Sequence, residues 1–256
     1  MVPSQHRIVH LAETGSTNAD AMRLAVSGEP LPLWVTADRQ TAGRGRSGRL
    51  WTSLPGNLQA SLAFTSLAPL NRAGELSLVA GLALVETVCA LSPLAAKGGI
   101  RLKWPNDLLI GPAKAGGILV ETTTARGEPG FLAVIGFGLN VASSPDDIGR
   151  TATSLAAEGI GTDVARVVAV LADTCADWIA RWDDGRGFDA IRHSWMAKAG
   201  AIGEAITVNT ASGPVAGSYQ GLAESGALLA EIDGRIRTIT YGDVALIAPT
   251  NKGMAQ

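Results

Sequence analysis

Arginine and glycine alternate in one short segment that contains no acidic residue. Residues 40–51 read Gln-Thr-Ala-Gly-Arg-Gly-Arg-Ser-Gly-Arg-Leu-Trp, and no Asp or Glu occurs between Arg39 and Gly74. Glycine lets backbone N–H groups point at a ligand, and arginine offers forked donors that suit phosphate or carboxylate. The segment lacks both the Gly-Lys-Ser/Thr ending of a Walker A loop and the glycine spacing of a dinucleotide-binding loop. It predicts an anion-binding loop, with a solvated basic loop or an RNA-binding patch as the alternatives.

A second segment places an amide and a carboxylate where a strand is expected to end. Residues 103–108 read Lys-Trp-Pro-Asn-Asp-Leu, and a proline at the end of an apolar strand stops the hydrogen-bonded ladder. Asn106 and Asp107 are thereby delivered into a turn. A carboxylate beside an amide, near a phosphate-binding loop, can hold a hard cation such as Mg²⁺. An ordinary turn closed by the Asn or Asp side chain is the alternative.

Three further segments carry weaker signals. Lys114 precedes two glycines and could clamp a carboxylate or phosphate, although a lone lysine in a turn is more often a surface residue. Glycines at 136 and 138 interrupt an apolar strand that ends near Asn140, which indicates a close approach by a ligand or a neighbouring backbone. Ser16 and Thr17 precede an alanine-rich run, and helix capping alone accounts for them.

Short strands and a few helices must position these residues. Because several strands follow one another without crossover helices, the sheet should be antiparallel or mixed rather than a doubly wound parallel one. Strands are expected at 7–11, 33–37, 58–64, 100–104, 108–110, 118–123 and 132–139, and helices at about 19–27, 75–91, 164–181 and 188–196. Residues 111–114 are expected to form a turn.

The pattern of predicted elements changes after Gly200, from mixed helices and strands to short strands alone. Five strand-like pieces separated by turn signals predict a small all-β barrel. The pieces are 205–210, 214–220, 227–231, 236–240 and 244–247. We therefore expect a first domain at 1–200, a second at 201–250 and a frayed tail at 251–256.

Composition and charge set outer limits on the function. The chain has 256 residues, of which 46% are hydrophobic and 17% charged, with a net charge of −2, so a sizeable core is expected and general attraction to nucleic acid or membrane is not. Cys89 and Cys175 are expected to be two buried free thiols, and metal-ligand spacing is absent. Glu86 and Pro93 interrupt the most apolar stretch, which favours a buried helix. With no signal peptide visible, a soluble cytoplasmic protein is expected.

Taken together and in this order, the motifs resemble those of the biotin–protein ligases. These enzymes attach biotin to the carrier domain of biotin-dependent carboxylases. The motifs are 15–18, 40–51, 103–108, 114–119 and 136–140, joined by 153–155 and 226–229. The resemblance covers the chain from about Val9 to Ile247.

The family implies a fold that agrees with the strand interpretation. It is α+β, with a mixed, largely antiparallel sheet flanked by helices, of the class II aminoacyl-tRNA-synthetase-like type, and a small SH3-like barrel. Some members carry an N-terminal helix-turn-helix domain. Only about fifteen residues precede Ser16 here, so the ligase-only form without DNA binding is expected. The sequence leaves a homodimer open.

The family chemistry implies roles for the motif residues. The biotin carboxylate attacks the α-phosphate of ATP to give biotinyl-5′-AMP and pyrophosphate, and a carrier lysine then takes the biotin and releases AMP. Catalytic roles fall to Lys114, Arg46, Asp107 and Arg44. Biotin would contact Ser16, Thr17, Asn18, Gln40, Gly43, Arg44, Gly45, Arg46 and Lys114. ATP would contact Arg46, Arg49, Trp51, Asn106, Asp107 and Asn140, and Asp107 would bind Mg²⁺.

Three other functions compete with this interpretation. A lipoate–protein ligase would share the fold and chemistry, but the complete arginine–glycine loop and the 103–107 string favour biotin. An RNA-binding module would rest on the basic loop alone, and the net charge of −2 argues against it. A catalytically silent regulator of the same fold would be expected to lack some of the motif residues, whereas all are present.

Overall fold

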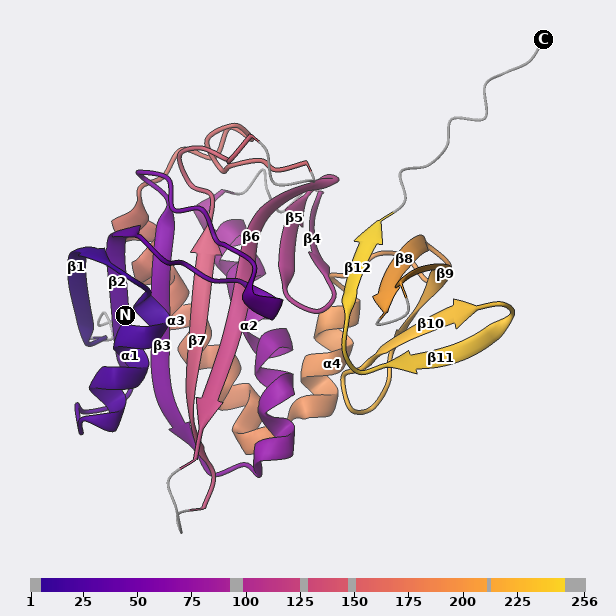
Figure 1. Ribbon diagram of the computed structural model, residues 1–256, viewed down its shortest axis with the longest axis horizontal. Helices are drawn as coiled ribbons and strands as arrows, with labels where there is room; N and C mark the ends of the chain where they lie inside the picture. The colour runs from indigo at the N-terminus through magenta and orange to yellow at the C-terminus, as the bar shows by residue number, and fades with distance from the viewer. Residues whose placement is uncertain (1–5, 93–98, 125–128, 147–150, 211–212, 247–256) are drawn as a thin grey trace. The chain divides into compact units, whose positions relative to one another are not determined.

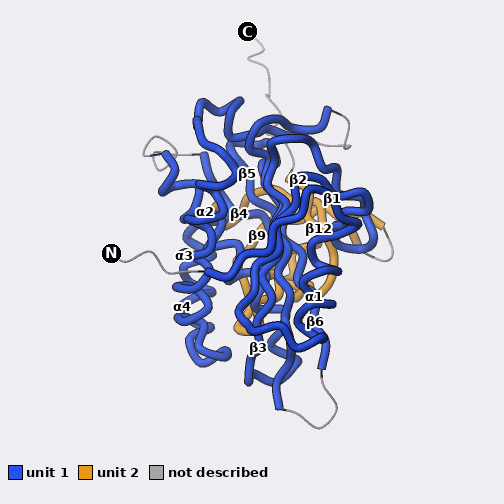
Figure 2. Tube along the Cα trace, turned by 90° about the vertical axis from the view of Figure 1, so that its left-hand side faces the viewer, with its two compact units in different colours: residues 1–199 blue, residues 200–256 orange. Residues whose placement is uncertain are grey.

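The chain divides into two compact units, residues 1–199 and 200–256 (Figure 2). The computed structural model describes residues 6–92, 99–124, 129–146, 151–210 and 213–246. The expected tail at 251–256 lies outside the described residues.

Seven strands form the sheet of the first unit (Figure 1). The outer pair, β1 and β2, is parallel, and α1 (Thr17–Val26) makes the connection that parallel strands require. The remaining neighbours are antiparallel, which confirms the expected mixed sheet. Its order is β1 (Ile8–Thr14), β2 (Leu33–Gln40), β3 (Leu58–Ser66), β7 (Phe131–Leu139), β6 (Ala113–Thr123), β5 (Asp107–Ile110), β4 (Ile100–Lys103).

Different helices pack on the two faces of this sheet. Helices α2 (Leu76–Leu91), α3 (Val164–Trp182) and α4 (Phe188–Met196) lie together on one face (Figure 1). Helix α1 packs on the other face, where Ala21 joins Leu33 and Val35 in a buried cluster. Since side chains alternate along a strand, the middle strands carry apolar residues toward α2 and α3 and polar or small residues toward the α1 side.

Helix α2 is apolar on all sides because it is enclosed. The segment Leu70–Leu91 is long and apolar enough to cross a membrane, but 67% of its most apolar window is buried inside the protein. Two tryptophans of α3 donate to carboxylates of the α2 region: Trp178 Nε1 to Glu86 Oε2 at 2.8 Å, and Trp182 Nε1 to Glu75 Oε2 at 2.6 Å. The expected buried helix is confirmed.

The prediction of two buried thiols is right for Cys175 and wrong for Cys89, which is half-buried. Cys89 follows Glu86 by about one turn, on the less buried side of α2. Burial raises the pKa of both thiols.

Glu75 at the start of α2 is a buried carboxylate whose charge state should be visible in the pH dependence of stability. Burial is the largest effect and raises its pKa, against the lowering effects of Trp182 and Arg72. Above the ordinary glutamate pKa, the native carboxyl keeps a proton that the unfolded chain has released. The free energy of unfolding should therefore fall as the pH rises toward the raised pKa.

The substitution Glu75→Gln keeps an oxygen for the Trp182 indole and removes this titration. We expect the variant to show a flatter stability profile than the wild type over about pH 4 to 7. Urea unfolding of both proteins at several pH values measures the two slopes. Equal slopes would show that Glu75 does not carry the effect.

The second unit contains one antiparallel sheet of five strands. Their order is β11 (Arg235–Ile239), β10 (Leu228–Ile232), β9 (Gly213–Leu222), β8 (Ala205–Thr210), β12 (Asp243–Leu246). Asp233 and Gly234 both have positive φ, 52° and 71°, as the tight turn between β10 and β11 requires. The five expected strands are present, with Ile247 outside the described residues, and closure into a barrel stays a prediction.

Candidate active site

A row of paired residues crosses five strands of the first sheet. Gln59 on β3 pairs with Gly138 on β7, Gly138 with Gly117 on β6, Gly117 with Asp107 on β5, and Asp107 with Lys103 on β4. Directly paired residues present their side chains on the same face of a sheet. Two glycines therefore form a floor without side chains, between a glutamine on one side and a charged pair on the other.

The indole ring of Trp51 lies on this glycine floor. A Cβ added at Gly138 would fall 2.3 Å from Trp51 Cζ2, and one added at Gly117 would fall 3.4 Å from Trp51 Cζ3. Trp51 Nε1 donates to Gln59 Oε1 at 2.9 Å, and Lys114 Nζ lies 5.5 Å from the ring centroid. The ring is thus fixed in place as one wall of the site, with a cation against it.

The fit between Trp51 and Gly138 predicts that Gly138→Ala is disruptive. Its methyl group would meet the indole at an impossible distance, so the ring must leave the floor. Overpacking of this kind costs about 1–3 kcal/mol of stability, and the KM for the ligand of this site should rise. Gly161→Ala is the matched control, since nothing lies within 4 Å of its added Cβ. Equal melting temperatures and KM values for the two variants would contradict this packing.

A β-bulge turns Lys114 toward the floor. The pairing of β5 with β6 shifts between Leu108 and Leu109, so that Leu108 faces Gly116 while Leu109 faces Lys114. Ala115 is the extra residue. If β6 alternated regularly through Ala115, Lys114 would share the face of Gly116, whose added Cβ would contact Leu84 of α2. The bulge instead puts Lys114 on the face of Asp107, as bulges beside functional sites often do.

Lys114 lies in β6, not in the expected turn, and it is buried with 6% of its surface exposed. The alternative of a surface lysine is therefore wrong. Lys114 Nζ donates to Asp107 Oδ1, and Lys103 Nζ lies 2.9 Å from Asp107 Oδ2. The Asp107 carboxylate is thus held between two ammonium groups at this end of the floor.

This geometry does not fit the predicted role of Asp107 as a Mg²⁺ ligand. Both carboxylate oxygens are engaged by lysines, and the described residues contain no group of three or more His, Cys, Asp or Glu that could hold a metal. Asn106 is engaged as well. Its Nδ2 donates to the backbone oxygen of Ile118 at 2.7 Å, and its own backbone oxygen accepts from Ile118 N at 3.0 Å.

The other side of the floor is a network of uncharged polar groups that ends at the Glu121 carboxylate. Gln40 Oε1 accepts from Thr17 N at 2.8 Å and from Thr17 Oγ1 at 3.0 Å. Ser61 Oγ lies 2.7 Å from Thr17 Oγ1 and 2.6 Å from Asn18 Oδ1. Asn18 Nδ2 donates to Glu121 Oε2 at 2.7 Å. The predicted residues Thr17, Asn18 and Gln40 are therefore brought together by the strands beneath them.

Two sequence profiles match this chain. That of the Biotin/lipoate A/B protein ligase family matches residues 13–140, and that of the Biotin protein ligase C terminal domain matches residues 201–247. The chain belongs to the biotin/lipoate protein ligase family. Every predicted site residue of this family member, from Ser16 to Asn140, lies within the first matched range.

Curated relatives and solved structures agree with this assignment. The chain is 38% identical over 228 residues to biotin–[acetyl-CoA-carboxylase] ligase of Paracoccus denitrificans, covering 86% of this chain and 92% of that protein. The ligase of the same name from Mycobacterium tuberculosis is 34% identical over 241 residues, covering 91% and 86%. The structure of biotin protein ligase from Aquifex aeolicus in complex with biotin and ATP superimposes with a TM-score of 0.76 at 27% identity, covering 94% and 98%.

In this ligase-family chain, the arginine–glycine loop is a tight turn with Trp51 at its base. Arg44 and Leu50 form an isolated antiparallel bridge, and Trp51 N donates to Gly43 O at 2.9 Å. Positive φ angles at Ser47 and Gly48, 55° and 72°, close the turn. The turn displays its three arginines at the surface, with Arg44 and Arg49 exposed and Arg46 half-buried.

The predicted residues Ser16 and Asn140 differ in what their side chains bind. Ser16 takes the N-cap position of α1, but its side chain makes no capping bond; Gln40 binds the free Thr17 N–H instead. Asn140 is buried, and its Nδ2 donates to Thr153 O at 2.9 Å. Thr153 N in turn donates to Lys114 O at 2.9 Å. Asn140 therefore braces the strand that carries Lys114, and its contact with ATP stays a prediction.

Three residues of the site, Gln59, Ser61 and Glu121, are not recognisable from the local sequence motifs. Their partners lie between 8 and 103 residues away along the chain, so only the strand register brings them into the site. The polar residues of β3 do alternate with apolar ones, and a buried strand with Gln and Ser on one face was the available signal.

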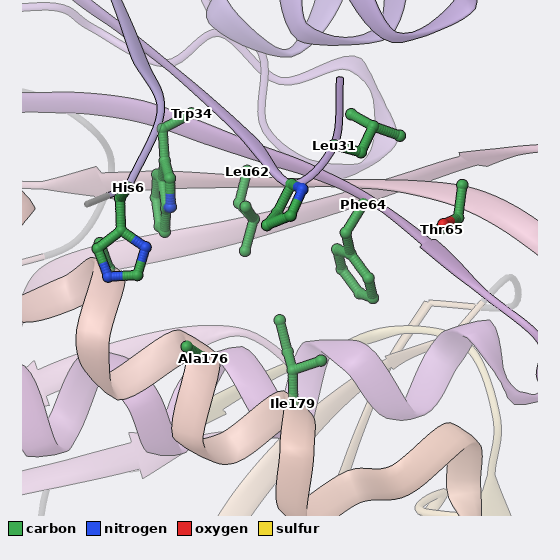
Figure 3. Close-up of a pocket in the computed structure, with 10 residues that line it drawn as sticks. His6, Leu31, Trp34, Leu62, Phe64, Thr65, Ala176 and Ile179 are labelled. Atoms are coloured by element: carbon green, nitrogen blue, oxygen red, sulfur yellow. The ribbon is translucent and has the colours of Figure 1, made fainter. Parts of the chain in front are cut away.

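A separate cavity of about 190 Å³ lies between the sheet and α3 (Figure 3). It is apolar, with Trp34, Leu62 and Phe64 on the sheet and Ile179 on α3. His6 stands at its edge and bonds to Asp173 at 2.8 Å. None of the predicted site residues lines this cavity, so it is distinct from the glycine floor.

Proposed function

We propose that this chain is an ATP-dependent biotin ligase that forms biotinyl-5′-AMP and transfers biotin to a specific lysine of a carboxylase carrier domain. The observation that carries the proposal is the glycine floor, which separates uncharged polar groups from a buried lysine. Biotin has the matching shape, with a polar bicyclic head, an apolar chain and a terminal carboxylate. The polar groups Thr17 and Gln40 suit the ureido ring, and Lys114 suits the carboxylate.

The first step joins two anions and therefore needs positive charge. A carboxylate oxygen of biotin attacks the α-phosphorus of ATP, and the bond from that phosphorus to pyrophosphate breaks. The ammonium of Lys114 neutralises the reacting oxygens, and Arg44, Arg46 and Arg49 bind the phosphates. Mg²⁺ enters on the phosphates as part of the substrate, since the Asp107 carboxylate is already held by lysines.

In the second step the amine of the carrier lysine attacks the acyl carbon of the adenylate, AMP leaves with the electrons of the broken acyl–oxygen bond, and the nitrogen gives up a proton to water. No nucleophile of the enzyme is required, because the mixed anhydride is already activated. We place this reaction in the cytoplasm, without a DNA-binding activity, and the net charge of −2 supports the latter.

Pyrophosphate release tests the proposal directly. Purified protein with ATP and Mg²⁺ should release pyrophosphate when biotin is added and not when lipoate is added. Release with lipoate alone would keep the fold and mechanism but replace the substrate. If the folded protein released no pyrophosphate with either biotin or lipoate, the proposed adenylation chemistry would be rejected.

The arginine–glycine turn should close over bound biotin and shield the adenylate from water. Limited trypsin digestion reports this closure, because Arg44 and Arg49 are exposed in the free protein. We expect the rate of cleavage at the turn to fall when biotin is present and to be unaffected by lipoate. An unchanged cleavage rate would mean that the turn does not act as a lid.

A further inference from the structure

Gln59 carries an amide nitrogen that is buried without a partner. Only 1% of the residue is exposed, and Nε2 has no hydrogen-bond partner among the described residues. Its Oε1, by contrast, accepts twice, from Gln40 Nε2 at 3.1 Å and from Trp51 Nε1 at 2.9 Å. Buried hydrogen-bond donors almost always have an acceptor in folded proteins. The unpaired Nε2 of Gln59 therefore indicates that a bound ligand supplies the acceptor.

The orientation of this amide is fixed by the chemistry of its neighbours. An indole nitrogen can only donate. The oxygen of Gln40 is committed to Thr17, so the Gln40 group that faces Gln59 is its NH₂. Both neighbours therefore require the oxygen of Gln59 on their side. Exchanging oxygen and nitrogen in Gln59 would set donors against donors, which leaves Nε2 as the free group.

The free donor lies where the polar network meets the glycine floor. Gln59 pairs across the strands with Gly138, and Ser61 two residues further along β3 belongs to the network of Thr17 and Asn18. Residues two apart in a strand share a face. The donor is therefore beside the groups proposed to hold the biotin head and beneath the wall formed by Trp51.

We propose that Gln59 determines substrate specificity by donating a hydrogen bond from Nε2 to the ureido carbonyl oxygen of biotin. This inference rests on the function proposed above. The ureido oxygen is an acceptor that the dithiolane ring of lipoate does not possess. A site that leaves a buried donor unpaired with one substrate and pairs it with another discriminates between them.

A paired change in enzyme and ligand tests the proposal. Gln59→Glu keeps an oxygen for Gln40 and Trp51 and removes the donor. In 2-iminobiotin the ureido oxygen is replaced by a nitrogen that donates. Calorimetric titration at about pH 8 without ATP should show biotin binding weakened by about 10- to 100-fold in the variant. Binding of 2-iminobiotin should be unchanged or tighter.

Equal weakening of both ligands would overturn the proposal, because Gln59 would then act only by positioning Gln40 and Trp51. Gln59→Met, which removes both functions of the amide, gives a second route. It should weaken biotin more than 2-iminobiotin, and equal losses would again count against the proposal. Gln220→Met in the second unit is the control, and circular dichroism checks the fold. A wild-type protein that binds neither ligand would reject the proposed function itself, and this inference with it.

Discussion

Lys114→Met is expected to reduce biotin-dependent pyrophosphate release by about 10³-fold. The substitution keeps an unbranched apolar side chain beside Gly117 on the glycine floor and removes the ammonium. That ammonium is buried beside the Asp107 carboxylate, in surroundings where a charge acts more strongly than it does in water. A second cation, Lys103, contacts Asp107 from the edge strand β4.

The fold should survive this change, because Lys103 still compensates Asp107. Measuring kcat and the melting temperature together therefore separates loss of chemistry from loss of structure. The exposed Lys198 offers a matched control, and Lys198→Met should leave both quantities as in the wild type. Normal pyrophosphate release by Lys114→Met would remove Lys114 from the mechanism.

Asp107→Asn is expected to destabilise the protein by about 3–5 kcal/mol. Two lysine side chains, 8% and 13% exposed, now share one buried carboxylate. Without its charge they face each other in a poorly solvated environment. Removing one partner of a buried ion pair is far more damaging than removing the whole group, because the remaining charge stays buried and unpaired.

A double-mutant cycle checks the origin of this effect. Lys103→Met should cost less stability in the Asp107→Asn background than in the wild type, since it removes a charge that has lost its partner. Additive losses would show that Asp107 does not hold the two lysines together. The Mg²⁺ concentration needed for half-maximal activity should be the same in Asp107→Asn as in the wild type. A raised requirement would restore Asp107 as a metal ligand.

The local sequence was sufficient for the elements of the fold, and the order of the motifs pointed to residues that the structure brings onto one face of the first sheet. Strand alternation and turn residues identified the seven strands of the first unit, and the motif order identified Thr17, Gln40, Trp51, Asp107 and Lys114. The unusual residue types of these motifs carried that information. Glycines that alternate with arginines, or a proline followed by Asn-Asp, are seldom needed for packing alone in a folded domain, so they indicate a binding site.

The parts that sequence reasoning missed depend on contacts between distant segments. Local pattern places Lys114 in a turn after Gly111, because nothing nearby announces a bulge. The engagement of both Asp107 oxygens follows from the pairing of β4, β5 and β6. The unpaired amide nitrogen of Gln59 can be recognised only when the donors that hold its oxygen, on Gln40 and Trp51, are known.

The bulge at Ala115 is a requirement on backbone conformation that the residue types of β6 do not express. If the same residues alternated strictly, Lys114 would share the face of Gly116 and its ammonium would lie toward the side chains of Leu84 and Leu139. Deleting Ala115 would not have this effect, because Lys114 and Gly116 would then be adjacent in a regular strand and would still point to opposite faces. The polarity of the site therefore depends on the parity of the pairing between Ile110 and Gly116. A straightened strand of unchanged length would invert that polarity, whereas a strand one residue shorter would keep it.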